Sequence, residues 1–283
     1  MKCIILAAGY ATRLYPLTEN FPKPLLKVGE KTILDWLVED LCEDPATAPE
    51  EFVVISNHKF APHFEAWAKE KNEGGLETRK QYRNSFLAPK NSSKLAKVTV
   101  VDDGTSSNET RLGAVKDIQY AMDQLGLEDD LLIIAGDNVL DFSLGKFVAY
   151  AKEKGTSCTM RYYEESERVL KKSGISEIAG DAIDPARQIA AADPDRLLSL
   201  EEKPENPKSH WCTPPFYYYT QEDAARIQEA IEDGCGTDAP GSLVAWMCRH
   251  TVIHSMEMPG RRYDIGDIKS YEEVQRTYRG IAK

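Results

Sequence analysis

The sequence has 283 residues, of which 42% are hydrophobic and 29% are charged, a composition typical of a soluble globular protein with an ample core. Its 35 lysines and arginines face 46 aspartates and glutamates, so the formal net charge is −11. This balance argues against non-specific nucleic-acid binding, which needs a basic surface. The net negative charge would repel an anionic ligand, so such a ligand would need local cations or a metal ion at its binding site.

In the first half of the chain, short apolar runs alternate with segments of helical periodicity. The pattern predicts strands at 2–7, 51–57, 97–101 and 130–135, and helices at 33–42, 63–71 and 114–125. Strands that alternate with helices predict a parallel sheet with helices on both faces. The polar segment 72–95 is longer than an ordinary connection, which indicates a flexible insertion or a lid.

After Asp141 the pattern changes to short strands separated by polar turns, which predicts a mixed or antiparallel extension of the sheet. The predicted strands are 156–163, 175–178, 197–200 and 216–219, followed by helices at 221–232, 240–249 and 270–278.

The chain shows no signal peptide, transit segment or apolar run that could cross a bilayer, so we expect a cytoplasmic protein without a membrane partner. Its cysteines lack the CxxC spacing of metal sites, and we expect reduced thiols rather than a disulfide or zinc framework. The six cysteines are Cys3, Cys42, Cys158, Cys212, Cys235 and Cys248.

The first predicted strand ends in Ala7-Ala8-Gly9, with Arg13 close behind and Lys23 between two prolines. Small residues let a ligand approach the backbone, and loop N–H groups with an arginine form an anion nest. The carboxyl end of a strand is also where open α/β sheets bind ligands. The alternative is a simple strand-to-loop turn, because the motif is neither GxGxxG nor GxxxxGK[ST].

Two acidic turns are candidate metal ligands. Asp137 follows the apolar strand at 130–135, and Asp264 precedes a glycine turn before the last predicted helix. Aspartates at such places also serve as turn residues or helix caps. Mg²⁺ usually takes one or two carboxylates together with substrate phosphate oxygens, so both interpretations stay open.

The run Leu200-Glu201-Glu202-Lys203-Pro204 places charges against a predicted strand. Charge runs are usually only solvated surface. Here Glu202 could also accept hydrogen bonds from sugar hydroxyls, and Lys203 could contact a phosphate.

In chain order, LAAGYATRLYPLTENFPKPLL, AGDN, SLEEKP and RYDIGD resemble the landmarks of the sugar-1-phosphate nucleotidyltransferases. GSLVAWMCRHTVIHSMEM resembles that family's helix and strand before the last turn, so the similarity covers nearly the whole chain. It implies a Rossmann-like three-layer α/β sandwich, with a mostly parallel sheet and a smaller mixed or antiparallel extension. It also implies one domain over 1–283, with a nucleotide-binding half (1–141) and a half for the sugar and the second metal ligand (142–283).

The resemblance implies that an NTP and a sugar 1-phosphate give an NDP-sugar and pyrophosphate with Mg²⁺ as cofactor, and it leaves a homo-oligomer open. It assigns the catalytic phosphate contacts to Arg13 and Lys23. It assigns Mg²⁺ binding to Asp137 and Asp264. It assigns nucleotide binding to Leu6, Ala7, Ala8, Gly9, Asp103 and Gly113. It assigns sugar-phosphate binding to Gly174, Glu202 and Lys203. No protein nucleophile is needed, because the protein positions two anions and neutralises the developing charge.

Three stretches depart from the family pattern. Tyr10 and Ala11 stand where the signature often has Gly or Ser and then Gly. VVDDGTSSNETRLGA replaces the base-reading segment, where Asp103 would favour a base edge that donates, as cytosine N4 does. The segment 213–216 replaces one that usually carries a glycine near the sugar. The base and the sugar are therefore left open.

Other functions compete with this interpretation. A cytidylyltransferase for a phosphorylated alcohol such as phosphocholine would need an aromatic cage, which the rings of 211–219 could supply, although strand propensity explains successive tyrosines more simply. A non-catalytic nucleotide-sugar binding protein fits less well, because both candidate cations and both candidate metal ligands are present. A Rossmann dehydrogenase would need the missing GxGxxG.

Overall fold

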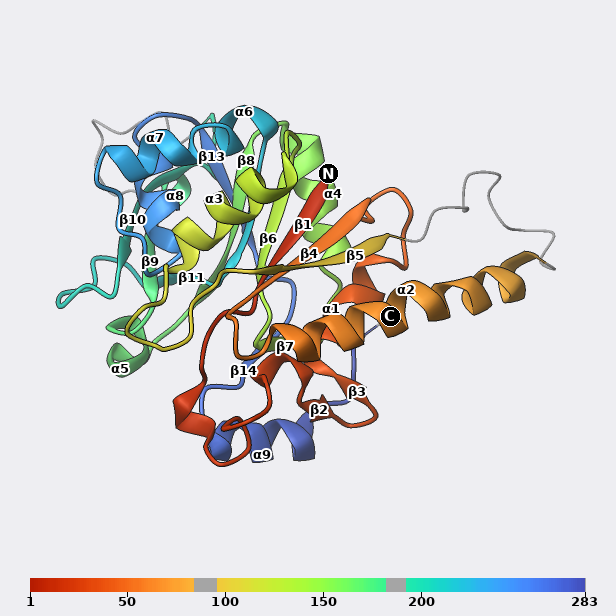
Figure 1. The fold of residues 1–283 in the computed structure, drawn as a ribbon. Helices are drawn as coiled ribbons and strands as arrows, with labels where there is room; N and C mark the ends of the chain where they lie inside the picture. Colours follow the sequence, from red (N-terminus) through yellow and green to blue (C-terminus); the bar gives the residue numbers. More distant parts are fainter. Residues whose placement is uncertain (84–95, 182–191, 283) are drawn as a thin grey trace. The chain divides into compact units, whose positions relative to one another are not determined.

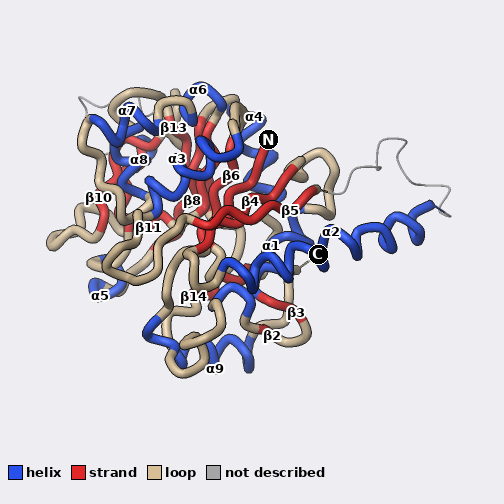
Figure 2. Tube along the Cα trace, in the orientation of Figure 1, coloured by secondary structure: helices blue, strands red, loops and turns tan. Residues whose placement is uncertain are grey.

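The computed structural model describes residues 1–83, 96–181 and 192–282, and it shows an α/β fold, as predicted (Figures 1 and 2). The chain forms two compact units. Unit 1 comprises Met1–Arg111, Ala135–Gly145 and Gly260–Lys283, and unit 2 comprises Leu112–Ile134 and Lys146–Pro259. These units do not follow the expected halves, since 112–134 lie in unit 2 and 260–283 in unit 1.

The sheet of unit 1 is parallel, as the alternation of strands and helices predicts. β4 (Glu51–Ser56) lies between β1 (Lys2–Leu6) and β5 (Lys97–Asp102), with Cys3 opposite Phe52 in the register (Figure 1). The central residues of β1 and β4 are fully buried, as expected of continuous apolar runs covered on both faces.

Helices and short strands complete unit 1. Its helices are α1 (Ile33–Leu41), α2 (Ala61–Arg83), α9 (Ile268–Thr277) and the 3₁₀ turns η1 (Thr12–Leu14) and η2 (Lys23–Leu25). Its short strands are β2 (Lys27–Val28), β3 (Lys31–Thr32), β7 (Asn138–Leu140) and β14 (Arg262–Asp264).

The helix predicted at 63–71 is longer than expected, because α2 continues to Arg83. Asn72 explains part of the difference. Its amide group donates to the carbonyl of Val98 and accepts from the N–H of Val98, both at 2.9 Å, which joins α2 to β5. The first part of the predicted insertion is therefore helical, and the remainder, 84–95, lies outside the described residues.

Unit 2 contains the mixed sheet that the second half of the sequence predicts. Its strands are β6 (Leu131–Ala135, whose last residue belongs to unit 1), β8 (Ser157–Tyr163), β9 (Gly174–Ile178), β10 (Leu197–Glu202), β11 (Trp211–Thr213), β12 (Phe216–Tyr219) and β13 (Ile253–Glu257). β8 pairs antiparallel with β11 and β12 and parallel with β13. β9 pairs antiparallel with β10 and β11, and β12 with β6.

In unit 2 the helix predicted at 114–125 is confirmed as α3, whereas the helices predicted at 221–232 and 240–249 are shorter than expected. The predicted helix 221–232 is two helices, because the chain turns at Ala225 and Arg226. The helices are α3 (Ala114–Leu125), α4 (Gly145–Lys154, which begins in unit 1), α5 (Glu167–Leu170), α6 (Gln221–Ala224), α7 (Ile227–Glu232), α8 (Gly241–Met247) and the 3₁₀ turn η3 (Ala179–Asp181). Among the described residues no helix is long and apolar enough to cross a membrane.

The aromatic run of β12 belongs to the core. The side chains of its four residues are at most 2% exposed, and the Tyr218 hydroxyl donates to Asp130 at 2.6 Å. The Arg161 guanidinium already lies over the ring of Trp211, 5.2 Å from the ring centroid. The rings that an aromatic cage would need are therefore occupied by packing. All six cysteines are free, as expected.

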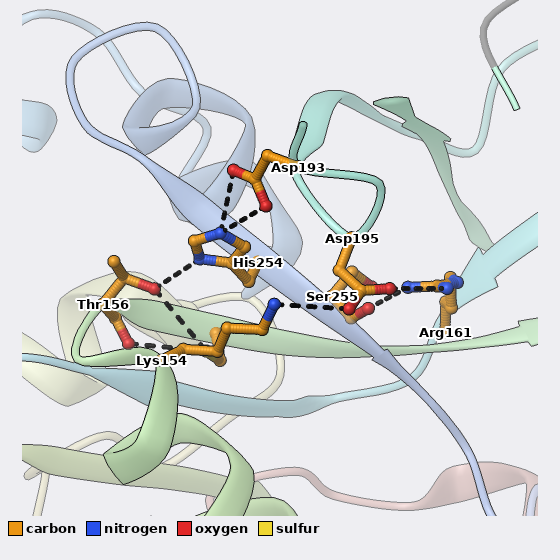
Figure 3. Close-up of polar contacts among 8 residues, drawn as sticks. Lys154, Thr156, Arg161, Asp193, Asp195, His254 and Ser255 are labelled. Carbon is orange, nitrogen blue, oxygen red and sulfur yellow. Dashed lines mark hydrogen bonds and ion pairs between the residues drawn. The ribbon is translucent and has the colours of Figure 1, made fainter. Parts of the chain in front are cut away.

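A polar cluster fixes the segment that leads into β10 (Figure 3). His254 of β13 lies 3.0 Å from a carboxylate oxygen of Asp193. Asp195 pairs with Lys154 at 3.4 Å and with Arg161 at 3.3 Å. Burial alone would raise the pKa of Asp195, but these two cations hold it below its usual value. Lys154 of α4, Arg161 of β8 and His254 of β13 thus hold the two aspartates that precede β10.

Asp35 joins α1 to α2 in unit 1. It forms a capping box with Thr32 at the start of α1, and it accepts a hydrogen bond from the Trp67 indole at 3.0 Å. The Lys71 ammonium lies 2.6 Å from the same carboxylate. Burial alone would raise the pKa of Asp35, but these hydrogen bonds lower it below its ordinary value.

We predict that Asp35→Asn lowers the free energy of unfolding by about 1–3 kcal/mol at pH 7, because a buried ion pair and its hydrogen bonds lose their charge. The folded-state pKa lies below the unfolded value of about 3.9. The stabilisation is therefore complete above about pH 4 and is lost as pH falls through the folded-state pKa. Urea unfolding of parent and variant at pH 7 and pH 3 should show their difference shrinking at the lower pH.

The exposed Glu43→Gln is the matched control, for which we expect a change within about 0.5 kcal/mol. An equal parent-to-variant difference at both pH values would show that the carboxylate charge of Asp35 is not what stabilises this contact.

Candidate active site

The turn after β1 is fixed by buried hydrogen bonds. The Ala7 N–H donates to the carbonyl of Ile55 at 2.9 Å, and the carbonyl of Ala8 accepts from the Asn57 side chain at 2.9 Å. Asn57 is fully buried, and its other amide atom accepts from the backbone of Phe60. Asn57 was not among the predicted site residues. Its signal was a polar residue directly after the apolar run EFVVIS, at the same sheet edge as the first turn.

Neither the backbone conformation at position 9 nor any described neighbouring residue requires glycine there. A Cβ built on Gly9 would meet nothing within 4 Å, and its φ lies outside the left-handed region. Ala11 is the opposite case, with φ 47° and ψ 40°, a conformation that favours glycine. This explains why related signatures often have glycine there. Open space above Gly9 is what a ligand that approaches the backbone needs.

The two candidate cations take different positions in unit 1. Arg13 lies in η1 and is exposed, and one of its terminal nitrogens is 3.9 Å from where a Cβ on Gly266 would lie. Lys23 lies in η2, its side chain only 8% exposed, and its ammonium donates to Asp137 at 2.9 Å. Each cation therefore lies beside one of the two predicted acidic turns.

Pairing of β7 with β14 brings these two acidic turns together. Asn138 is opposite Asp264 in the antiparallel register, and the N–H of Ile265 donates to the carbonyl of Asp137 at 3.4 Å. The side chains of Asp137 and Asp264 are 40% and 54% exposed. Two acids far apart in the sequence thus meet at one short ladder, with solvent access to both.

The surroundings of Asp137 favour its charged form. Burial raises its pKa, but the Lys23 ammonium and the Arg262 guanidinium more than offset this, so that the pKa lies below the usual value. Asn138 also donates to the other carboxylate oxygen at 2.6 Å. Asp137 is therefore ionised at neutral pH, as a metal-binding carboxylate must be.

The donor set fits Mg²⁺ better than a metal that needs a full protein cage. Within the described residues no group of three or more His, Cys, Asp and Glu side chains is placed to hold a metal ion. Mg²⁺ is commonly held by one or two carboxylates and completes its shell with water and phosphate oxygens. Asp137 and Asp264 match that requirement.

The predicted sugar-phosphate residues gather in unit 2. Glu202 is opposite Gly174 in the β9–β10 register. Glu202 is the last residue of β10, so the strand runs two residues beyond its predicted end at Leu200. Lys203 follows in a left-handed conformation, φ 49°, and its N–H donates to the carbonyl of Ser173 at 3.0 Å. A non-glycine residue in this conformation is strained, a feature concentrated at functional sites.

The two residues predicted to line the base pocket lie in different units. In unit 1, Asp103 is 7% exposed, and one carboxylate oxygen accepts from the N–H of Thr105 at 2.7 Å, while the other has no hydrogen-bond partner in the described part of the chain. Burial raises the pKa of Asp103, opposed by the amide and hydroxyl of Thr105. The carboxylate faces the protein interior, so contact with a base would require its side chain to turn.

Backbone conformation and close packing both require glycine at position 113 of unit 2. Its φ is +92°, and a Cβ would lie 2.5 Å from the carbonyl oxygen of Thr237. The N–H groups of Ala114 and Val115 donate to the carbonyls of Asp238 and Thr237 at 3.2 and 3.0 Å. Two backbone N–H groups at the start of α3 are therefore already hydrogen-bonded within the protein. The predicted contact of Gly113 with a nucleotide stays a prediction.

The fold matches solved nucleotidyltransferase structures. A UDP-glucose pyrophosphorylase complexed with UDP-glucose aligns with a TM-score of 0.71 over 98% of this chain and 97% of that chain, at 17% identity. A UTP-bound enzyme of the same kind from Acinetobacter baumannii aligns with a TM-score of 0.67 over 97% and 91%, at 14% identity. Identities this low show the fold alone.

Sequence relatives define the family. The chain is 29% identical over 221 residues to a glucose-1-phosphate thymidylyltransferase of Mycolicibacterium smegmatis, which covers 77% of this chain and 61% of the relative. It is 22% identical over 280 residues to a UTP–glucose-1-phosphate uridylyltransferase of Synechocystis, covering 98% of this chain and 63% of the relative. The chain thus spans less than two thirds of the length of each. The model of the nucleotidyl transferase family matches residues 2–280, and the chain belongs to this family.

We predict that Gly9→Ala leaves the free energy of unfolding within about 0.5 kcal/mol of the parent, because no residue that the structure describes contacts the added methyl group. The same methyl group should obstruct a nucleotide that approaches the turn and raise the KM for NTP by about tenfold or more, which corresponds to about 1.4 kcal/mol. Urea unfolding and steady-state kinetics check the two halves. An unchanged KM would show that no ligand uses the space above Gly9.

Proposed function

We propose that this protein transfers a nucleotidyl group from an NTP to a sugar 1-phosphate, forming an NDP-sugar and releasing pyrophosphate. The observation that carries the proposal is the meeting of Asp137 and Asp264 across the β7–β14 ladder, with Lys23 on the first and Arg13 beside the turn of the second. Two acids and two cations in one unit are the charges that two reacting phosphate groups require.

Lys23 has a role that follows from its partner. Without substrate its ammonium is held by Asp137 in a largely buried position. When phosphate oxygens arrive, the ammonium has a second anionic partner within its reach, and the Asp137 carboxylate becomes free to contact a metal ion. Lys23 therefore holds its charge in place for the phosphates and keeps Asp137 ionised until then.

Arg13 supplies a different kind of cation. Its guanidinium is exposed, so it is available to a ligand, and its planar fork suits two phosphate oxygens at once. Its place beside Gly266 puts it next to the turn that carries Asp264. We assign to Arg13 the stabilisation of the charge that gathers on pyrophosphate as it leaves.

Asp137 and Asp264 would hold Mg²⁺, which would neutralise charge on the phosphate oxygens when bound. The chain's own contribution is to keep Asp137 ionised, through the Lys23 and Arg262 charges beside it, and to leave Asp264 exposed. A net charge of −11 makes these local cations necessary for an anionic substrate.

Unit 2 would bind the sugar 1-phosphate through Glu202, Lys203 and the backbone of Gly174. Glu202 is a half-buried carboxylate opposite Gly174, suited to accept hydrogen bonds from sugar hydroxyls. Lys203 is exposed, and its strained backbone fixes where the side chain starts. The phosphocholine alternative lacks support, because the rings of β12 are core residues.

The decisive experiment is a pyrophosphate-release screen of ATP, GTP, CTP, UTP and dTTP against several sugar 1-phosphates, with phosphocholine as a further acceptor. We expect release only when an NTP and a sugar 1-phosphate are both present. Release with phosphocholine alone among the acceptors would instead establish the phosphorylated-alcohol function, and binding of nucleotide sugars without any release would establish a non-catalytic protein.

Metal dependence gives a second prediction. Asp264→Asn removes a charged ligand and keeps the side-chain shape, so the Mg²⁺ concentration for half-maximal rate should rise by at least about 10–100-fold. Asp267→Asn is the matched control, because Asp267 lies on the same turn, is exposed and caps α9, and asparagine caps equally well. Equal Mg²⁺ titrations of both variants would exclude Asp264 as a ligand.

A further inference from the structure

The Glu202 carboxylate lies between two glycines of unit 2. A Cβ on Gly174 of β9 would be 3.3 Å from the Oε1 atom of Glu202. A Cβ on Gly241, the first residue of α8, would overlap this oxygen and lie 3.0 Å from the Glu202 Cδ atom. A methyl group of Leu200 would be within 3.6 Å of either added atom. Two bare backbone segments and one methyl group therefore set the position of this carboxylate.

The backbone of Gly241 does not itself call for glycine. Its φ lies outside the left-handed region, and alanine forms helices better than glycine at the start of α8. Gly113, by contrast, combines a positive φ with a backbone carbonyl in the way of any side chain. What an alanine at 241 would meet first is the end of the Glu202 side chain. The absence of a side chain at Gly241 is thus explained by the space that Glu202 occupies.

We infer that Gly241 is a positioning residue for the sugar 1-phosphate: its missing side chain fixes the carboxylate of Glu202 in the place from which that carboxylate binds the sugar. This inference rests on the proposed function, because it takes Glu202 as the sugar contact. The Gly241 backbone N–H adds to the effect, since it favours the ionised carboxylate against burial, which raises the pKa of Glu202.

The consequence of a substitution follows from which atoms collide. The atom in the way of a Cβ at 241 is the far end of a flexible side chain, not backbone. Gly241→Ala should therefore displace the carboxylate and leave the fold intact. A displacement of about 1 Å at a group that positions substrate can cost up to about a hundredfold in rate. The residues proposed to act on the NTP phosphates, among them Asp137 and Lys23, belong to unit 1, so NTP binding should not change.

The first test is steady-state kinetics of Gly241→Ala with the NTP and sugar 1-phosphate that give the highest rate for the parent. We expect the KM for the sugar 1-phosphate to rise about tenfold or more, with the KM for NTP and the melting temperature unchanged. Gly236→Ala is the matched control, because it adds the same methyl group to the same segment, 2.9 Å from the Ser242 hydroxyl and away from Glu202. We expect parental kinetics from it.

The second test is a double-mutant cycle with Glu202→Asp. Aspartate is shorter by one methylene, so its carboxylate no longer reaches the space beside Gly241. Glu202→Asp alone should raise the KM for the sugar 1-phosphate. Adding Gly241→Ala to it should change that KM by less than about twofold, because the two residues act through one contact.

Each outcome decides one question. Parental kinetics of Gly241→Ala in an active enzyme, or additive effects in the cycle, would overturn the positioning role and leave the proposed function standing. A lower melting temperature with both KM values unchanged would assign Gly241 to packing alone. If no sugar 1-phosphate supports pyrophosphate release by the parent, the proposed function fails first, and the inference falls with it.

Discussion

The antiparallel pairing of β7 with β14 is the contact on which the arrangement of unit 1 depends. Each strand has three residues, and neither buries enough surface to be stable alone. Their ladder joins the middle of the chain to its end and places two carboxylates at one edge. The Tyr278 hydroxyl, which donates to the carbonyl of Leu140 at 2.7 Å, holds the two segments together from α9. Without this pairing the acids would be unrelated turn residues.

Electrostatics then determines what the paired acids can do. Burial would favour the protonated form of Asp137. Lys23 and Arg262 supply the opposing charge from within unit 1, so that Asp137 stays ionised. A similar arrangement occurs in unit 2, where the cations Lys154 and Arg161 keep Asp195 ionised just before the start of β10. In an acidic protein, the few cations placed beside carboxylates decide where anions can bind.

Sequence reasoning succeeded where one segment carries its own signal. The apolar runs of β1, β4 and β5 predict buried parallel strands, and the structure confirms them. Family landmarks identify Asp137 and Asp264 one at a time. Their proximity could not be derived from the sequence, because β7 and β14 are too short to show periodicity. The length of α2 was also not predicted. Its contact with β5 through Asn72 is a tertiary hydrogen bond, which the polar sequence of this segment does not indicate.

Residues that act on a neighbouring residue were the hardest to predict. Asn57 holds the turn after β1 by a hydrogen bond and stands in none of the quoted motifs. Gly241 opens a stretch that resembles the family, but this resemblance does not connect it to Glu202. Their proximity joins positions in β10 and α8 that only the folded chain brings together. Tyr217 and its neighbours are core residues of a strand, which is the simpler of the two interpretations that the sequence offered for the aromatic run.

The order in which the two units use the chain has a consequence for biosynthesis. All segments of unit 2 have left the ribosome once residue 259 has emerged, whereas unit 1 also needs residues 260–283. Chains fold progressively from the N-terminus as they are made. A nascent chain that stops near residue 259 would hold every residue of unit 2 but only one of the two acids, Asp137. The pairing that brings Asp264 beside Asp137 would therefore form only after residues 260–283 have been synthesised.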